Sequence, residues 1–215
     1  MRYNVICVSS KLRRRCNISD KETIEVYNQN VEKYRALVDK LPNTKTLKSF
    51  MGRFDTGANI LDFGCGVGNS AAAMRAGGLR PVCRDGSVEM VKTANELYQL
   101  DASVALFSEL NDNSVYDGVW ANFSLLHASK LEFPYLISAL HTSLKPKGWL
   151  FVALKLGNGE RRDKFGRHYA YYQEDELDAI LIKAGFAVDE KIYGKSRGMA
   201  GTDESWIGGF YQKAS

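Results

Sequence analysis

The sequence predicts an α/β fold, namely a doubly wound, mostly parallel sheet with helices on both faces. Three observations lead to this class. From residue 59 onward, apolar strand-like runs alternate with amphipathic helix-like segments, which is typical of a parallel sheet covered on both sides. The connections between these segments carry helix-capping residues and glycines. The last two strand-like runs follow one another without a helix, so an antiparallel pair is expected there.

The chain before the first strand is expected to be helical. Apolar and aromatic residues recur at helical spacing over residues 21–41, with Asp20 as the N-cap and Pro42 just beyond the end. A second, shorter helix is expected over residues 45–54.

The remaining elements follow from the same patterns. Strands are expected at 59–63, 80–85, 103–107, 116–123, 148–157, 187–194 and 205–213, and helices at 69–77, 87–100, 131–146 and 174–186. Ser87 suits an N-cap, Pro134 a first helical turn and Gly185 a helix end. There is no internal repeat, so residues 21–215 are expected to form one domain.

Composition argues against several classes of protein. The 215 residues are 45% hydrophobic and 25% charged, which is average for a globular chain that buries its own core. No apolar stretch approaches the ~18 residues of a membrane span. The four cysteines form no CxxC pair and no cluster with histidine. We therefore expect no metal site, no membrane contact and a cytoplasmic protein with reduced thiols.

The net charge of +4 originates in the N-terminal segment. Residues 1–19 hold five basic side chains and no acidic one, which leaves 24 basic and 25 acidic side chains in the rest of the chain. The body therefore gives no electrostatic reason to expect a nucleic-acid partner. We predict a basic, disordered extension over residues 1–20. An organelle transit peptide is the alternative.

The motif ILDFGCGVGNS at residues 60–70 predicts a ligand site. Its three glycines let the chain turn sharply after a strand and let a ligand touch the backbone. Ligands of open parallel sheets bind at the carboxyl ends of the strands, where this loop is expected. A dinucleotide-binding loop would have its third glycine at position 69, which is Asn69. Asp85 ends the next strand and can accept both hydrogens of a ribose diol.

Together these motifs resemble the class I methyltransferases that use S-adenosylmethionine. ILDFGCGVGNS resembles the cofactor loop of that family, CRDGSVEM its ribose-binding stretch, and YDGVWANFSLLH with LKPKGWL its fourth strand and the turn into its fifth. The resemblance covers roughly residues 22–213. The later stretch KFGRHYAYYQEDELDAILIKAGF resembles a bacterial small-molecule branch described as tellurite-resistance-like. The family resemblance implies a Rossmann-like, seven-stranded sheet with an antiparallel last strand, and a helical lid over residues 21–56.

The resemblance also implies the cofactor, S-adenosyl-L-methionine, the product S-adenosyl-L-homocysteine, and a set of binding residues. Asp85 would bind the ribose, Gly86 and Ser87 would lie beside the adenine, and Asn122 would face the methyl group. The full set is Tyr27, Tyr34, Asp62, Gly64, Cys65, Gly66, Gly68, Asp85, Gly86, Ser87, Phe107, Ser108, Glu109 and Asn122. Three of these have a simpler alternative: Asp62 as a cap of the loop, Cys65 as a buried filler and Glu109 as a surface acid.

Asn122 and His127 are the candidate catalytic residues. His127 follows the fourth strand and is either a general base or a hydrogen-bonded residue that shapes the loop. Tyr27 and Tyr34, on one face of the first helix, either enclose the sulfonium or simply pack. Arg167 either binds an anionic substrate group or forms a surface ion pair.

We therefore predict a methyltransferase that acts on a small molecule by in-line displacement. A nucleic-acid or protein methyltransferase is the nearest alternative, although the turn NFSL lacks the prolines that usually accompany methylation of a base amine. A non-catalytic S-adenosylmethionine-binding protein and a nicotinamide oxidoreductase are further alternatives. The sequence favours no acceptor atom and no oligomeric state.

Overall fold

The computed structural model describes residues 20–39 and 45–214. Its strands are β1 Asn59–Phe63, β2 Arg80–Asp85, β3 Ser103–Val104, β4 Tyr116–Asn122, β5 Leu144–Leu156, β6 Glu160–Arg162, β7 His168–Tyr172, β8 Phe186–Arg197 and β9 Asp203–Lys213. Its helices are α2 Lys21–Gln29, α3 Val31–Val38, α4 Lys45–Met51, α5 Asn69–Ala76, α6 Val88–Tyr98, α7 Phe133–Ser143 and α8 Glu174–Lys183, with short 3-10 helices η1 Phe107–Glu109 and η2 Leu125–His127. The extension expected over residues 1–20 lies outside the described residues except for Asp20, and so does Pro42.

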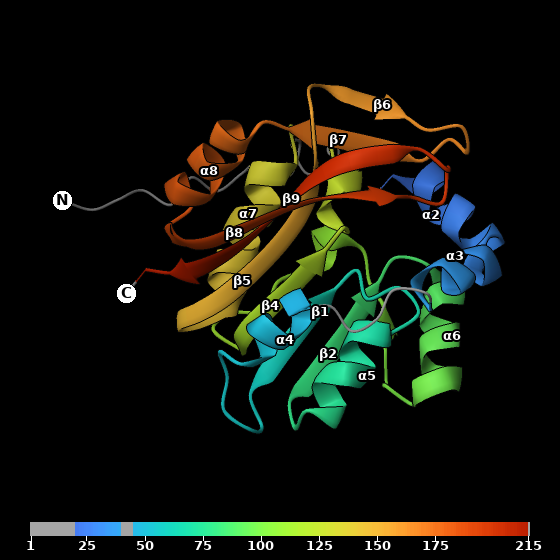
Figure 1. Ribbon diagram of the computed structural model, residues 1–215. Helices are drawn as coiled ribbons and strands as arrows, with labels where there is room; N and C mark the ends of the chain where they lie inside the picture. Colours follow the sequence, from blue (N-terminus) through green and yellow to red (C-terminus); the bar gives the residue numbers. More distant parts are fainter. Residues whose placement is uncertain (1–19, 40–44, 215) are drawn as a thin grey trace.

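The described strands form one sheet in the order β3-β2-β1-β4-β5-β9-β8, with the β6–β7 hairpin attached to β5 (Figure 1). All neighbours from β3 to β5 run parallel, and β9 lies antiparallel between β5 and β8. The predicted fold class, a mostly parallel sheet with an antiparallel last strand, is therefore confirmed. The predicted number of seven strands is too low, because the sequence did not reveal the two strands of the β6–β7 hairpin.

The β6–β7 hairpin extends the sheet beyond the carboxyl end of β5. Residues Lys155 and Leu156 of β5 pair in parallel with Tyr171 and Tyr172 of β7. The hairpin turn, residues 163–167, therefore projects toward α2 (Figure 1).

Several predicted boundaries were wrong. The single helix expected over residues 21–41 is two helices, because the helix is interrupted at Asn30. The amide of the Asn30 side chain donates to the carbonyl of Val26 (2.8 Å) and its backbone leaves the helical region. Asparagine favours such local bonds over a continuous helix. The strand expected over residues 103–107 is only two residues long, and η1 follows it.

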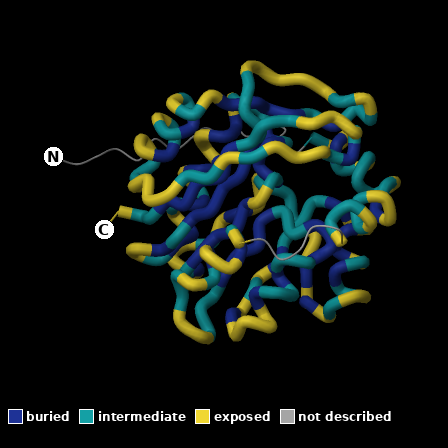
Figure 2. The backbone as a smooth tube through the Cα atoms, viewed as in Figure 1, coloured by how far each residue is buried: buried dark blue, intermediate teal, exposed yellow. Residues whose placement is uncertain are grey.

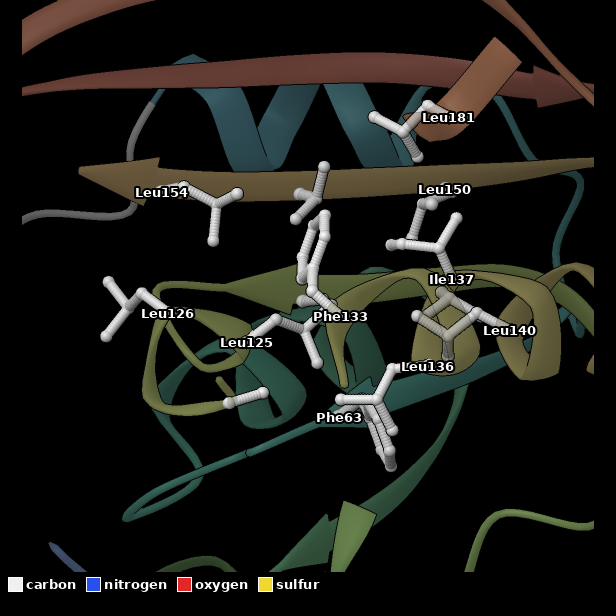
Figure 3. Packing of buried hydrophobic residues seen from close by; sticks show 14 of the residues in the cluster. Phe63, Leu125, Leu126, Phe133, Leu136, Ile137, Leu140, Leu150, Leu154 and Leu181 are labelled. Carbon is white, nitrogen blue, oxygen red and sulfur yellow. The ribbon is translucent and has the colours of Figure 1, made fainter. Parts of the chain in front are cut away.

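The core lies on both faces of the sheet. Side chains along the central strands alternate between two clusters, as strand geometry requires. On β5, Leu150, Val152 and Leu154 face α7 and α8, whereas Phe151 and Ala153 face the side that α4 covers. Figure 2 shows the buried central strands between more exposed helices, and Figure 3 shows the packing of α7 against the strands. Among the described helices, none is long and apolar enough to cross a membrane.

Candidate active site

A pocket with a cavity volume of about 80 Å³, which opens to solvent, lies at the carboxyl edge of the sheet. The pocket lies between the chain that follows β1, β2, β3 and β4 and the N-terminal helices α2 and α3. Its lining residues are Asp20, Thr23, Ile24, Tyr27, Tyr34, Gly64, Gly66, Asp85, Gly86, Met90, Ala105, Leu106, Phe107, Asn122, Phe123, Ser124 and His127.

The pocket brings together most of the residues named from the sequence. The residues on its wall are Tyr27, Tyr34, Gly64, Gly66, Asp85, Gly86, Phe107, Asn122 and His127. The named residues that do not line it are Asp62, Cys65, Gly68, Ser87, Ser108 and Glu109. Two of these have local roles: the Ser87 hydroxyl accepts from the amide of Met90 and caps α6, and the Glu109 carboxylate accepts from the amide of Leu106.

Other lining residues were missed. The N-terminal end of α2 contributes Asp20, Thr23 and Ile24. The spacing of Thr23, Ile24 and Tyr27 places them on one face of a helix, and that signal was available in the sequence. Phe123 was also missed, and its backbone has a φ of 56°. Non-glycine residues in this region are strained and are concentrated at functional sites.

The glycine loop brings the main chain up to the pocket. Gly64 and Gly66 have φ values of 83° and 54°, which favour glycine. A Cβ at Gly66 would lie 3.1 Å from Cε1 of Tyr34, and a Cβ at Gly64 would lie 2.3 Å from Cβ of Ser124. The loop therefore needs glycine partly because other parts of the same chain pack against it.

Asp85 organises this loop from the end of β2. Its Oδ2 accepts from the amide of Gly66 (2.8 Å) and its Oδ1 from the amide of Ser87 (2.8 Å). Burial raises the pKa of Asp85 above its ordinary value, and the amide donors, Gly86 among them, partly oppose this. An ionised carboxylate can accept about four hydrogen bonds, so Asp85 retains acceptor capacity toward the pocket.

Asp62 is a second buried carboxyl group next to the loop. It is 2% exposed, and its Oδ2 has no hydrogen-bond partner among the described residues. Burial and the charge of Asp85 raise the pKa of Asp62 to about 7. Near neutral pH, Asp62 is therefore partly protonated.

His127 is held by hydrogen bonds on both ring nitrogens. Nδ1 lies 2.6 Å from the carbonyl oxygen of His168, and Nε2 lies 2.9 Å from the hydroxyl of Tyr27. Burial lowers the pKa of His127 to about 3, although the bond to His168 opposes this shift. The imidazole is therefore neutral at physiological pH.

The low pKa of His127 predicts a pH-dependent stability. The unfolded chain protonates this histidine below its ordinary pKa of about 6.5, whereas the folded protein does so only near 3, so stability falls as pH decreases through this window. Between pH 7.5 and pH 5, the His127 term should cost about 2 kcal/mol of unfolding free energy. Urea unfolding of wild type and His127→Gln at both pH values measures it. His141, whose pKa is also lowered, is present in both proteins. An equal pH dependence in the two proteins would contradict the assignment.

The strands of the β6–β7 hairpin are bonded to the start of α2. Arg162 forms two hydrogen bonds with the carboxylate of Asp20 (2.8 and 3.0 Å) and lies 3.2 Å from Glu22. The hydrogen bond from Arg162 holds the pKa of Asp20 well below its ordinary value. The amide of His168 donates to the hydroxyl of Thr23 (2.8 Å). These contacts fix the start of α2 over the pocket.

Replacement of Arg162 by alanine should loosen α2. The ion pair is partly exposed, so its loss should cost ~0.2–1 kcal/mol. Amide hydrogen exchange over residues 21–29 should then become faster by up to about fivefold. Arg161→Ala is the matched control, because the guanidinium of Arg161 bonds Glu204 rather than α2. Equal exchange in the two variants would show that Arg162 does not hold the helix.

Arg167 is neither a free anion-binding group nor a surface ion pair. It is 3% exposed and donates from Nε (3.0 Å) and Nη2 (2.7 Å) to the same oxygen of Asp163. Its Nη1 donates to the hydroxyl of Tyr27 (3.0 Å). The predicted ion pair is therefore present, with Asp163, but it is buried and not at the surface. Over residues 20–39 and 45–214, no group of three or more His, Cys, Asp or Glu side chains is placed to hold a metal ion.

Comparison with known proteins gave a family match. The model of the family described as "Methyltransferase domain" matches residues 31–191. No match was found among the curated proteins.

Three of the similar solved structures illustrate the fold. An S-adenosylmethionine-dependent methyltransferase of Methanosarcina mazei has 17% identity and a TM-score of 0.69, over 77% of this chain and 97% of that one. The 1,6-didemethyltoxoflavin-N1-methyltransferase of Burkholderia thailandensis, with bound 1,6-didemethyltoxoflavin and S-adenosylhomocysteine, has 20% identity and a TM-score of 0.66, over 89% and 88%. The phosphoethanolamine N-methyltransferase 2 of Haemonchus contortus, in complex with S-adenosyl-L-methionine, has 14% identity and a TM-score of 0.68, over 87% and 57%.

Proposed function

The chain belongs to the methyltransferase domain family and is an S-adenosylmethionine-dependent enzyme, and we propose that its methyl acceptor is a small molecule. The acceptor would be methylated by in-line displacement inside the pocket at the carboxyl edge of the sheet. The lid expected over residues 21–56 would comprise α2 and α3 in this proposal, because Leu47 and Phe50 of α4 pack in the core beside Phe151.

The residues of the pocket fit the cofactor. Gly64, Gly66 and Gly86 expose bare backbone on one wall, and a side chain at Gly66 would meet Tyr34. Asp85 would accept from the ribose hydroxyls. Apolar side chains suited to a flat base also line the pocket, and they are Ile24, Met90, Leu106 and Phe107. The predicted residues that do not line the pocket would act indirectly, through the shape of the neighbouring backbone. They are Asp62, Cys65, Gly68, Ser87, Ser108 and Glu109.

When bound, S-adenosylmethionine supplies a sulfonium methyl group that is already activated for displacement. The protein's contribution is alignment and exclusion of water, which can supply ~7–11 kcal/mol. Tyr27 and Tyr34, with ring centroids 5.6 Å apart, would place aromatic faces and edges around the positive charge. Asn122 and His127, at the carboxyl end of β4 and on η2, would face the reacting atoms.

One observation carries the small-molecule assignment. The hydroxyl of Tyr27 on α2 lies 2.9 Å from Nε2 of His127 on η2, and both residues line the pocket, so α2 covers this side of the site. A base in a polynucleotide would have to be flipped out of its stack, and a side chain in a protein brought in with its backbone, to reach a site covered in this way. The bound 1,6-didemethyltoxoflavin of the Burkholderia thailandensis enzyme supports the same class of acceptor on this fold.

The alternatives have less support. A nucleic-acid substrate would need a basic groove, and residues 20–215 carry 24 basic and 25 acidic side chains. The likeness of residues 164–186 to the tellurite-resistance-like branch remains a prediction and carries no acceptor chemistry. A non-catalytic cofactor binder would keep the same pocket and differ only in turnover.

Transfer of a labelled methyl group tests the proposal. The purified protein is incubated with S-adenosyl-L-[methyl-³H]methionine and one of three pools from a cell extract, namely low-molecular-weight filtrate, nucleic acid or protein. Label in the filtrate pool alone supports a small-molecule acceptor. Label that is sensitive to nuclease or protease would overturn it. Calorimetric titration with S-adenosylhomocysteine and with NADH accompanies the assay, and binding without turnover in any pool would favour the non-catalytic alternative.

A further inference from the structure

A buried network behind the pocket fixes where the protons lie on Tyr27 and His127. A guanidinium has only donors, so the Tyr27 oxygen must accept from Nη1 of Arg167 (3.0 Å). A carbonyl oxygen only accepts, so Nδ1 of His127 must carry a proton toward His168 (2.6 Å). A neutral imidazole has one N–H, so Nε2 is bare and accepts the hydroxyl proton of Tyr27 (2.9 Å).

Arg167 is itself held in place by hydrogen bonds to Asp163. Asp163 takes two hydrogen bonds from its guanidinium through Oδ2, and Oδ1 of Asp163 accepts from the amides of Phe165 (2.9 Å) and Arg167 (3.1 Å). The turn of the β6–β7 hairpin is thus built around this ion pair. Arg167 also lies 5.2 Å from the ring centroids of both Tyr27 and Tyr169. Because the guanidinium of Arg167 is held in place, it leaves the hydroxyl of Tyr27 little freedom to rotate.

We infer that Tyr27 and His127 act as one proton-accepting unit, that Arg167 is its positioning residue, and that the acceptor is a hydroxyl or amine that loses a proton on methylation. The inference rests on the proposed function. Both members of the unit line the pocket, next to Asn122 at the end of β4. The hydroxyl groups of Tyr27 and Tyr169 interact. An acceptor N–H or O–H would meet the Tyr27 oxygen and take the place of the Tyr169 hydroxyl.

The proton transfer balances without a further reactant. The acceptor atom forms its bond to the methyl carbon as the methyl–sulfur bond breaks, and the electron pair of the broken bond stays on sulfur. The acceptor's proton moves to the Tyr27 oxygen while the Tyr27 proton moves to Nε2 of His127. The resulting imidazolium donates from Nε2 to Tyr27 and from Nδ1 to His168, so both N–H groups keep a partner.

The groups around His127 determine when this histidine can accept the proton. The charged or titratable groups that face His127 are Tyr27 from α2, Lys155 from β5, and Arg167, His168 and Tyr169 from the hairpin. Burial disfavours a charged imidazole before reaction, and the cations Lys155 and Arg167 add to this effect. Methyl transfer removes one positive charge from the pocket, and a proton on His127 restores it. The unit is therefore poised to accept a proton during transfer and not before.

Imidazole ¹⁵N spectroscopy of the full chain tests the inference without turnover. The chain has three histidines, and loss of signal in His127→Gln assigns the one of interest. Spectra are recorded for the free protein and for its complex with S-adenosylhomocysteine.

We expect His127 to be neutral with its proton on Nδ1 from pH 8 to pH 5. Tyr27→Phe should shift the Nε2 resonance toward that of an unbonded nitrogen. Arg167→Met should shift it in the same direction and raise the pH at which His127 titrates, whereas Arg167→Lys should restore most of both effects.

The outcomes separate the two proposals. A proton on Nε2 in the wild type, or no response of Nε2 to Tyr27→Phe, would overturn the relay while leaving the proposed function in place. Lower stability of Arg167→Met with unchanged His127 signals would make Arg167 a purely structural residue. Absence of any spectral change with S-adenosylhomocysteine would count against the proposed function instead. Once methyl labelling has identified the acceptor, Tyr27→Phe should lower kcat by roughly 10²–10⁴-fold without a matching loss of S-adenosylhomocysteine affinity. An acceptor without an N–H or O–H group would overturn the proposed substrate class.

Discussion

Asp85→Ala is expected to weaken binding of S-adenosylhomocysteine by about 100-fold or more, since two hydrogen bonds to a charged group contribute ~3 kcal/mol or above. The substitution removes the proposed partner of the ribose hydroxyls. It also removes the acceptor that holds the amide of Gly66 at 2.8 Å, so the glycine loop loses its anchor. Isothermal titration calorimetry measures the effect, and urea unfolding establishes that the variant is folded.

Two further variants sharpen this experiment. Asp85→Asn keeps the shape and one acceptor oxygen, so its affinity should lie between those of wild type and Asp85→Ala. Asp175→Ala removes an exposed carboxylate on α8, remote from the pocket, and should bind as wild type does. Unchanged affinity in Asp85→Ala would remove Asp85 from the cofactor site.

Gly64→Ala should destabilise the fold by roughly 2–5 kcal/mol. The added Cβ would lie 2.3 Å from Cβ of Ser124, and the backbone at Gly64 has a φ of 83°. Ser124 has little room to move away, because its hydroxyl donates to the carbonyl of Phe63 (2.5 Å). Equilibrium urea unfolding with an unchanged m-value measures the loss.

Glycine controls separate the clash from the backbone strain. Gly159 also has a positive φ, 71°, but a Cβ there would meet nothing within 4 Å, so Gly159→Ala isolates strain and should cost ~1–2 kcal/mol. Gly198 has open space and an ordinary φ, so Gly198→Ala should be within about 0.5 kcal/mol of wild type. Equal losses at Gly64 and Gly159 would mean that the contact with Ser124 relaxes freely.

The elements that the sequence predicted well are those whose signals are local. β1, β2, β4, α5 and α6 begin and end near the expected residues, because each is bounded by its own caps, glycines and apolar runs. The loop after β1 and Asp85 were predicted together because parallel strands bring their carboxyl ends to one edge. The same reasoning placed Asn122 and His127 on the pocket wall.

The misses have non-local causes. The tyrosine-rich run His168–Tyr172 became strand β7 because β5 extends past the end of β4 and offers it a partner there, which no local pattern reveals. The contact of Arg167 with Tyr27 was equally hidden, since these residues are 140 positions apart in the chain. The break at Asn30 was local, but helical periodicity outweighed the asparagine in the sequence reading.

The place of β9 in the sheet has a consequence for biosynthesis. β5 pairs with β9 from Trp149 to Lys155, and β8 joins the sheet only through β9. A ribosome therefore releases β5 long before residues 203–213 exist to cover its edge. During that interval the apolar strand presents unpaired backbone, which favours association with other chains. Nascent chains stalled before β9 should therefore need chaperones to stay unaggregated, even though the whole cofactor loop has already been made.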